Sequence, residues 1–249
     1  NYVGLGGLLD MTRREPDGEP TIPGFPIADM AGGLSAALGI VSALLSRELG
    51  EGGAEHLDVA MTDAVLSLSQ LIAGPAMAGE SQRPGETITT GKYPCYDVYE
   101  TSDGRYVTLA ALEPKFWQAF CEAIDREDLI EAHMAEAERT REHVRSELEA
   151  VFAGRTREEW MDRLGDEDVM VGPVKSIEEA VDDPHIQARD LVEDADGMLR
   201  RVGFPVGGLD GLDRTEQPAP DLGEHTDEVL GEAGYGDDEI ASLRERDVI

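Results

Sequence analysis

The sequence predicts an α/β fold, and two patterns along the chain carry this prediction. Within residues 27–72, a helix of small apolar residues is followed by a glycine-rich turn, a short strand and a second apolar helix. This alternation of helix and strand is typical of a layered α/β structure. Further along, residues 96–110 alternate apolar and polar side chains around an Asp-Gly pair, which is a strong signal for a β-hairpin.

The first helix is predicted to begin at or just after Asp29 and to continue through Leu45. Its N-terminus would present unpaired N–H groups and a partial positive charge, which favour an ionised carboxylate. Alanines at 28 and 31 and glycines at 32 and 33 would let a substrate lie against the backbone there. Such a carboxylate can act as a base or a nucleophile. Asp is also among the best N-cap residues, so capping alone is the competing explanation.

The following segment completes the first region of the chain. Residues 48–53 include three glycines and are predicted to end the helix. A short strand over 55–60 and an apolar helix over 61–72 follow. We therefore assign residues 1–73 to a first, larger domain. Residues 74–95, rich in Gly, Pro, Ser and Thr, are predicted to be a linker or long loop.

Residues 96–190 are predicted to form a second, smaller α/β domain that starts with the hairpin. Helices are expected over 114–125, 140–152 and 156–164, and a strand over 168–174. The last two helices are expected to begin at Thr140 and Thr156, because each has Glu placed early in its helix. Residues 191–249 would return to the large domain, with strand candidates around 199–204 and a helical tail over 226–246.

The charge of the chain is extreme. It carries 53 Asp and Glu against 21 Lys and Arg, a net charge of −32, and only three of the cations are lysine. The acids are spread along the whole chain, which argues against an acidic interaction tail. Such a composition makes nucleic-acid binding very unfavourable. It resembles that of cytosolic proteins from salt-accumulating halophiles, and it predicts that folding requires high salt.

Other features of the sequence indicate the compartment. The two cysteines, Cys95 and Cys121, form no disulfide framework and fit a reducing cytoplasm.

The chain opens with Asn1 and has no charged leader, so we expect an upstream N-terminal part to be missing. The longest apolar run, 36–45, is broken by Gly39 and Ser42, which predicts no membrane partner.

Several segments together resemble the class III coenzyme A transferase superfamily, which includes CoA-transferases and α-methylacyl-CoA racemase. The matching segments are 24–33, 57–64, 96–106, 172–174, 183–185 and 222–230. The resemblance implies a Rossmann-like large domain, incomplete here at its N-terminus, a smaller α/β domain, and an interlocked homodimer. It also implies acyl-CoA thioesters as substrates, with coenzyme A as part of the substrate and no separate cofactor for the chemistry.

Within this superfamily Asp29 falls on the catalytic carboxylate. The resemblance implies a nucleophile in the transferases and one of two acid/base groups in the racemase. Glu113-Pro114 resembles a Glu-Pro pair of the racemases, where the Glu lies near the active site. The stretch 86–94 lacks the Gly-Asn-x-His-Pro or glycine-rich element that transferases tend to carry. An acid before Pro is also a favourable helix start anywhere, which is the alternative explanation of Glu113.

The resemblance also places a catalytic His a few residues before Asn1. Backbone N–H groups of Met30 and Ala31 are candidates for contacting the thioester oxygen, because enolate charge needs nearby donors. Arg13 and Arg14 are weaker candidates for CoA phosphates. No histidines have metal-ligand spacing with a third partner, so no metal is expected. His133 and His143 are expected to be solvated, and His56 to pack in a strand.

Three functions remain open from the sequence. The first is a racemase or epimerase that inverts the α-carbon of 2-methylacyl-CoA thioesters by two-base proton transfer. The second is a class III CoA-transferase that moves CoA between carboxylic acids through an Asp29-linked covalent intermediate. The third is an inactive fragment or scaffold.

Overall fold

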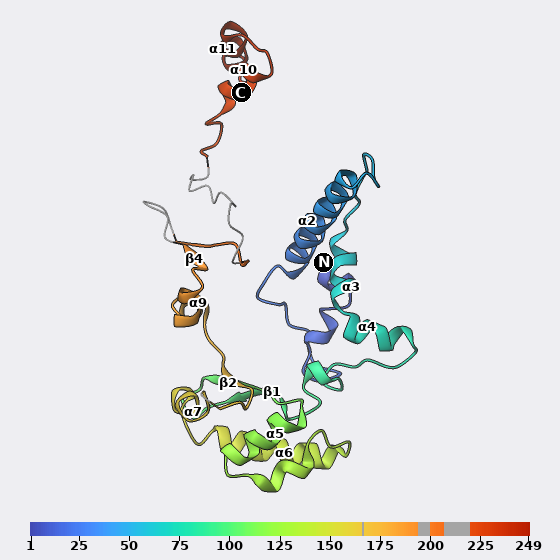
Figure 1. Cartoon of the computed structure of the whole chain (residues 1–249), viewed down its shortest axis with the longest axis vertical. Coiled ribbons are helices and arrows are strands. Elements are labelled where there is room, and N and C mark those ends of the chain that lie inside the picture. Colours follow the sequence, from blue (N-terminus) through green and yellow to red (C-terminus); the bar gives the residue numbers. More distant parts are fainter. Residues whose placement is uncertain (166, 194–199, 207–219) are drawn as a thin grey trace. The chain divides into compact units, whose positions relative to one another are not determined.

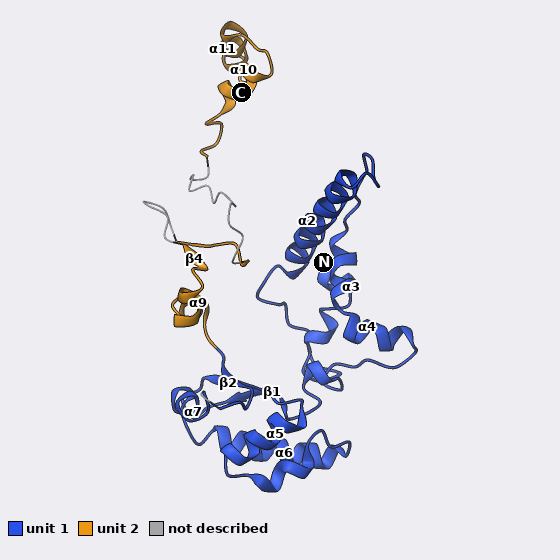
Figure 2. Cartoon of the chain, viewed as in Figure 1, with its two compact units in different colours: residues 1–174 blue, residues 175–249 orange. Residues whose placement is uncertain are grey.

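The computed structural model describes residues 1–165, 167–193, 200–206 and 220–249 (Figure 1). The chain divides into two compact units, Asn1–Val174 and Lys175–Ile249, and each is described by itself (Figure 2). Helices and strands are both present, in agreement with the predicted α/β class. The predicted domain boundaries after residues 73, 95 and 190 and the Rossmann-like layout stay predictions.

The first unit begins with helices only. These are α1 (Tyr2–Leu5), η1 (Asp10–Thr12), α2 (Ile27–Glu48), α3 (Met61–Leu68), α4 (Gln70–Met77) and η2 (Ile88–Thr90). Helices α2 and α3 pack against each other, and Gly32 sets their separation. A Cβ atom at Gly32 would lie 2.8 Å from Cγ of Met61, so a larger residue would push the two helices apart.

Two predictions for this region are wrong. Residues 55–60 form no strand in the described chain, although Ala60 has extended backbone angles. A strand needs a neighbouring strand for its N–H and C=O groups, and a local pattern does not report that neighbour. The helix predicted over 61–72 is interrupted at Ser69. The Ser69 amide and hydroxyl both donate to the Leu66 carbonyl, at 3.1 and 2.7 Å, which ends α3 there.

Helix α2 is 22 residues long and leaves much of its apolar surface exposed. Leu34, Leu38 and Val41 are 71, 70 and 62% exposed. With a mean hydropathy of 1.6, α2 has the length and composition of a membrane-crossing helix, properties that it shares with core helices of proteins in water. The expected absence of a membrane partner stays a prediction.

An antiparallel sheet in the order β1-β2-β3 forms the centre of the remaining part of this unit. Strands β1 (Tyr96–Glu100) and β2 (Tyr106–Ala110) confirm the predicted hairpin, and Gly104 in its turn has φ of 71°. The strand predicted over 168–174 is shorter than expected and becomes β3 (Val171–Pro173), which pairs with β2.

Helices pack around an aromatic core in this region. They are α5 (Pro114–Ala123), η3 (Glu127–Ala132), α6 (Glu138–Phe152) and α7 (Arg157–Leu164). The Phe152 ring stacks on Tyr99 and Phe120 at centroid distances of 5.0 and 5.9 Å and meets Trp160 edge-on at 5.3 Å. Each such pair adds roughly 0.5–1.5 kcal/mol beyond the burial of its area, so the aromatic contacts stabilise this core.

The predicted start of one helix is confirmed and that of another is wrong. Thr156 caps α7, since its hydroxyl accepts from the Glu159 amide at 3.2 Å and the Glu159 carboxylate accepts from the Thr156 amide at 2.8 Å. Helix α6 begins at Glu138, two residues before the predicted Thr140, and its N-cap Ala137 offers no side-chain acceptor. The start of α6 is therefore not set by a side-chain cap.

The second unit contains α8 (Ile177–Val181), α9 (Pro184–Ala188), β4 (Val192–Glu193), β5 (Arg201–Val202), α10 (Thr226–Glu232) and α11 (Asp237–Glu245). Strand β5 pairs with β4 and accounts for the strand predicted around 199–204, whose first residue lies outside the described residues. The helical tail predicted over 226–246 is divided in two. Gly234 has φ of 94°, which no helix accommodates, and it separates α10 from α11.

Candidate functional site

Asp29 lies in the first turn of α2, as its third residue. The N-cap is Pro26, which has no side-chain acceptor, so the explanation of Asp29 as an N-cap is wrong. The side chain is exposed, and its carboxylate makes no hydrogen bond or ion pair with any residue that the structure describes. An ionised carboxylate is favoured in this turn by the partial positive charge of the helix N-terminus. Asp29 is therefore available to a ligand.

The small residues around Asp29 divide into two groups. Ala28, Ala31 and Gly32 are buried, and Gly32 faces Met61, so the small size of these residues allows α2 to pack. Gly33 is exposed, and a Cβ atom placed there would meet nothing within 4 Å. Since residues four apart share a helix face, Gly33 leaves bare backbone one turn beyond Asp29. The predicted bare surface is thus narrower than the sequence suggested.

The backbone amides without a helical acceptor at this helix start lie two residues before the predicted ones. The Met30 amide donates to the Pro26 carbonyl at 3.0 Å, and in the helical pattern the Ala31 amide donates to the Ile27 carbonyl. Both predicted amides thus already have a carbonyl acceptor, and their contact with a thioester oxygen stays a prediction. The Ile27 amide donates to the Phe25 carbonyl at 2.8 Å. The amides without a helical acceptor are those of Ala28 and Asp29.

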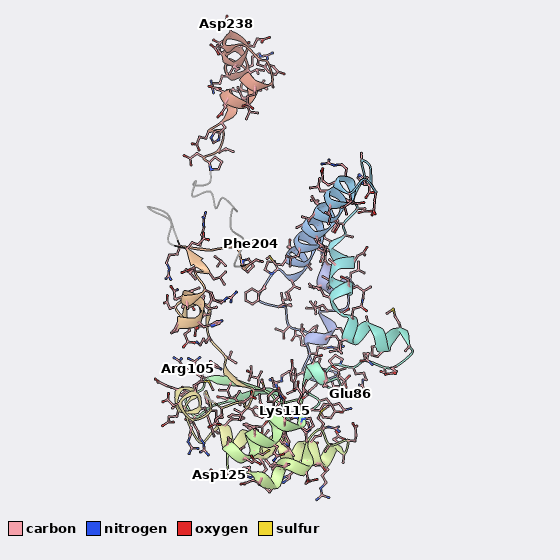
Figure 3. All side chains as sticks on the ribbon, viewed as in Figure 1. Glu86, Arg105, Lys115, Asp125, Phe204 and Asp238 are labelled. Atoms are coloured by element: carbon pink, nitrogen blue, oxygen red, sulfur yellow. The ribbon has the colours of Figure 1, made fainter. Side chains whose placement is uncertain are left out.

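Glu113 is the N-cap of α5 and stands three residues after the end of β2. Its carbonyl accepts from the amides of Phe116 and Trp117 at 3.0 and 3.1 Å, and Pro114 occupies the first helical position. The helix-start explanation is thus confirmed for its backbone. Its side chain is exposed and makes no capping hydrogen bond, so the carboxylate itself is not used for that purpose. Lys115, labelled in Figure 3, follows on α5 with its Nζ 4.2 Å from the centre of the Phe116 ring.

The structure does not join Asp29 to Glu113. The two residues stand on different elements, and no hydrogen bond or ion pair connects them or their helices in the described part of the chain. Their predicted roles in one site stay predictions.

Both predicted phosphate-binding arginines already have protein partners. Arg13 donates to the Pro16 carbonyl at 2.7 Å and pairs with the Asp10 carboxylate, which organises the loop after η1. Arg14 donates from Nη2 to Oδ1 of Asp97 at 2.9 Å. Arg145 on α6 contacts the other oxygen of the same carboxylate. Asp97 is therefore a structural tie that the sequence did not reveal, because it joins residues far apart in the chain.

Two cavities border this tie. The smaller, about 480 Å³, has among its lining residues Arg13, Arg14, Tyr96 and Ala110, so it brings the arginine pair to the strand that leads to Glu113. The larger, about 1040 Å³, is a groove lined by cations and by a greater number of acids. The cations are Arg14, Lys92, Arg141 and Arg145, and the acids are Glu15, Asp97, Glu100, Glu138, Glu142 and Glu149. This excess of carboxylates does not favour an anionic ligand.

Replacing Asp97 by asparagine is expected to destabilise the first unit by about 2–4 kcal/mol, because it leaves the Arg145 guanidinium without its counter-charge. The Asp97 side chain is only 7% exposed. Urea unfolding followed by the fluorescence of buried Trp117 and Trp160 measures the change. The matched control is Asp125→Asn, which removes an exposed partner of Arg163 and should barely move the midpoint. Equal shifts of the urea midpoint for the two variants would contradict the structural role of Asp97.

The histidines differ from expectation at two positions. His133 was expected in solvent but is half-buried, with Nε2 3.1 Å from the Ala111 carbonyl and its ring stacked on Trp117. His56 was expected to pack in a strand but is exposed. His143 is exposed on α6, as predicted. Among the described residues no group of three His, Cys, Asp or Glu could hold a metal ion.

Comparisons with known proteins agree on the family. The sequence model of CoA-transferase family III matches residues 1–226. Succinyl-CoA:mesaconate CoA-transferase of Haloarcula hispanica is 34% identical over 93% of the chain and 59% of its own length. Alpha-methylacyl-CoA racemase of Mus musculus is 30% identical over 98% of the chain and 64% of its own length. The chain thus spans about three fifths of the length of these relatives.

Solved structures support the fold. A hypothetical protein from Mycobacterium tuberculosis superposes with a TM-score of 0.73 at 26% identity, covering 91% of this chain and 61% of the other. A CaiB/BaiF family protein from Brucella suis gives a TM-score of 0.73 at 23% identity, covering 93% of this chain and 61% of the other.

Proposed function

Since the chain belongs to CoA-transferase family III, we propose that the protein is an acyl-CoA enzyme that inverts the α-carbon of 2-methylacyl-CoA thioesters. Family membership supports an enzyme that handles CoA thioesters, with relatives that include both racemases and CoA-transferases. In this proposal no separate cofactor takes part in the chemistry. Coenzyme A is bound as part of the substrate.

The observation that carries the proposal is the exposed carboxylate of Asp29 in the first turn of α2, which has no partner among the described residues. A carboxylate that neither caps the helix nor pairs with a described residue is available for proton transfer. The α-proton of a thioester is weakly acidic, so a base must remove it while donors stabilise the enolate oxygen. The amides of Ala28 and Asp29, which have no helical acceptor, are the candidate donors.

Inversion follows if the proton leaves on one face and a different proton returns on the other. In the proposal Asp29 takes the α-proton or gives one back, and the electron pair of the broken C–H bond resides on the enolate between the two steps. The racemase resemblance implies a histidine as the second group. It also places Glu113 near the active site, and in this proposal Glu113 serves as a further acid/base group. Its free carboxylate at the start of α5 supports this assignment over one as a simple cap.

A second candidate is a CoA-transferase in which Asp29 is a nucleophile. The same free carboxylate supports it, and so does the 34% identity to a succinyl-CoA:mesaconate CoA-transferase. In that reaction an Asp29 oxygen attacks the thioester carbonyl, the C–S bond breaks, and CoA thiolate leaves, which produces an acyl-aspartyl anhydride. Return of the thiolate to the Asp29 carbonyl would release the acid and form an aspartyl thioester.

Isotope exchange and trapping distinguish the two reactions. We expect a 2-methylacyl-CoA incubated with the enzyme in D₂O, without an acceptor acid, to gain one deuterium at the α-carbon. We expect hydroxylamine or borohydride to leave Asp29 unmodified under the same conditions. An Asp29 adduct found by mass spectrometry, with no α-exchange, would overturn the racemase in favour of the transferase. Neither exchange nor adduct would favour the third possibility, an inactive scaffold.

We also propose that the enzyme works as a homodimer in the cytoplasm. The exposed leucines of α2 support a protein partner, since water contact with so much apolar surface is unfavourable. Cys95 and Cys121 are buried free thiols, and burial raises the pKa of Cys95 to about 11. Thiols of this kind suit a reducing compartment.

A further inference from the structure

Glu113 makes its helix-start hydrogen bonds through its backbone and not through its side chain. Strand β2 ends at Ala110, and Glu113 follows as the N-cap of α5. Its side chain makes no capping bond, so nothing on the side chain itself fixes where the carboxylate points. The direction of the carboxylate therefore depends on how firmly residues 111–117 are held.

His133 contacts this turn on both sides of Glu113. Its Nε2 lies 3.1 Å from the carbonyl of Ala111, two residues before Glu113. Its ring stacks on Trp117, four residues after Glu113, with centroids 5.7 Å apart and planes 22° from parallel. Because the acceptor is a carbonyl, Nε2 carries the hydrogen and donates. Trp117 in turn donates its amide to the Glu113 carbonyl at 3.1 Å.

His133 is itself well anchored. Its amide donates to the Ile130 carbonyl at 3.2 Å. The indole Nε1 of Trp117 donates to the carbonyls of Leu129 and Ile130, both at 3.2 Å, in a core where Trp117 is 1% exposed. The imidazole and the indole are thus fixed to the same end of η3. They form one brace against the turn.

His133 contacts the end of β2 through the carbonyl of Ala111, the residue that follows this strand. Ala111 is fully buried, and its amide donates to the Cys95 carbonyl at 2.8 Å. A buried carbonyl without a donor is costly, and His133 supplies one. Loss of that donor would leave the Ala111 carbonyl without a hydrogen bond, and the turn over residues 111–113 could then shift.

We propose that His133 is a positioning residue for Glu113: it fixes the backbone on both sides of Glu113 and so aims the free carboxylate. The proposal rests on the proposed function, in which Glu113 is an acid/base group. A displacement of about 1 Å at an acid/base group can lower turnover by about 10²-fold, so the brace has a measurable effect on catalysis. The alternative is that His133 only stabilises the core of the first unit.

The test is a double-mutant cycle between His133→Phe and Glu113→Gln in the full-length protein, read as α-deuterium exchange of a 2-methylacyl-CoA. His133→Phe keeps a ring against Trp117 and removes the donor. We expect it to lower kcat by about 10–100-fold with little change in KM. In the Glu113→Gln background the same change should have almost no further effect, because the aimed carboxylate is gone.

A second pair of variants covers failure of His133→Phe to fold. Glutamine places an amide N–H near the position of the imidazole Nε2, whereas asparagine is one methylene shorter. We expect His133→Gln to retain most of the exchange rate and His133→Asn to lose it, with similar melting temperatures. His143→Phe, at an exposed site of α6, is the matched control and should leave the rate unchanged.

The outcomes separate the two hypotheses. If His133→Phe lowers the rate by the same factor with and without Glu113, His133 acts through stability alone and the inference is overturned while the proposed function stands. Equal rates for the Gln and Asn variants would also overturn it. If Glu113→Gln exchanges at the full rate, Glu113 has no role in the proton transfer, and both the role proposed for Glu113 and that of His133 fall.

Discussion

Replacing Asp29 by asparagine is expected to lower turnover of an acyl-CoA thioester by about 10³-fold, within the range typical of a lost acid/base group. The expectation holds for both candidate reactions. A carboxamide can neither accept the α-proton near neutral pH nor attack a thioester carbonyl. The measurement is kcat and KM, either for α-deuterium exchange or for CoA transfer. A fall in kcat with little change in KM would locate the effect in the chemical step.

The structure explains why this variant should fold normally. Asp29 is the third residue of α2 and not its cap, and its carboxylate has no partner among the described residues. Removal of its charge costs only the interaction with the helix dipole, about 0.3–1 kcal/mol. The small residues that pack α2 on α3 are untouched. A large loss of activity would therefore not be a loss of structure.

A matched control separates catalysis from helix electrostatics. Asp238, labelled in Figure 3, is also an exposed acid in the first turn of a helix, α11. Asp238→Asn removes the same charge from the first turn of another helix and should leave activity unchanged. The role assigned to Asp29 would be contradicted by a variant that is folded by circular dichroism and as active as the unmodified protein.

Where neighbouring residues decide the structure, the sequence predicted it well. The hairpin of β1 and β2 follows from alternation around Asp103-Gly104, and both its strands and its turn are present. The start of α7 follows from Thr156 and Glu159, whose side chains and amides satisfy one another three residues apart. In each case the interacting groups lie within a few residues, so the pattern contains the whole interaction.

Where distant residues decide, the sequence failed. The strand expected over 55–60 needs a neighbour that a local pattern does not report, and none is present in the described residues. His133 looked like one more polar residue in a charged stretch, yet it contacts Ala111 and Trp117. Asp97 is joined to Arg14 and Arg145 across 83 and 48 residues of sequence. Only the fold brings such groups together.

The catalytic assignment depended on a different kind of information. The position of Asp29 before a turn of small residues drew attention, but spacing alone predicted an N-cap, which the structure contradicts. Family resemblance, and not local chemistry, indicated catalysis. The structure adds that the carboxylate is free and that Gly33 leaves open backbone beside it.

Salt is expected to have the largest effect on stability. Raising KCl from about 0.1 M to about 1 M should increase the melting temperature by about 10 °C or more. In a chain of this size, each kcal/mol added to the free energy of unfolding raises the melting temperature by roughly 2–4 °C. At still lower salt we expect the protein to lose its compact state. The measurement is thermal unfolding by circular dichroism over a salt series, with the far-UV spectrum recorded at each end.

The reason is unpaired charge. If each of the 21 cations neutralised one carboxylate, a surplus of 32 negative charges would remain. Carboxylates also adjoin one another at helix starts, at Glu158-Glu159 in α7, Glu178-Glu179 in α8 and Asp237-Asp238-Glu239 in α11. Salt reduces the screening length from about 10 Å at 0.1 M to about 3 Å at 1 M, which removes most of this repulsion. It also weakens exposed ion pairs, but these contribute only about 0–1 kcal/mol each.

Two controls assign the effect to screening of charge. Sucrose at equal osmolality favours the compact state without screening, so it should raise the melting temperature much less than KCl does. A variant with four exposed acids outside the first turns of helices neutralised should need less salt for the same stability, namely Glu142→Gln, Glu149→Gln, Glu232→Gln and Glu245→Gln. A melting temperature that stays constant from about 0.05 M to about 1 M KCl would show that burial of the aromatic core outweighs the charge at every salt concentration. The acid-rich surface would then serve solubility and not require salt for folding.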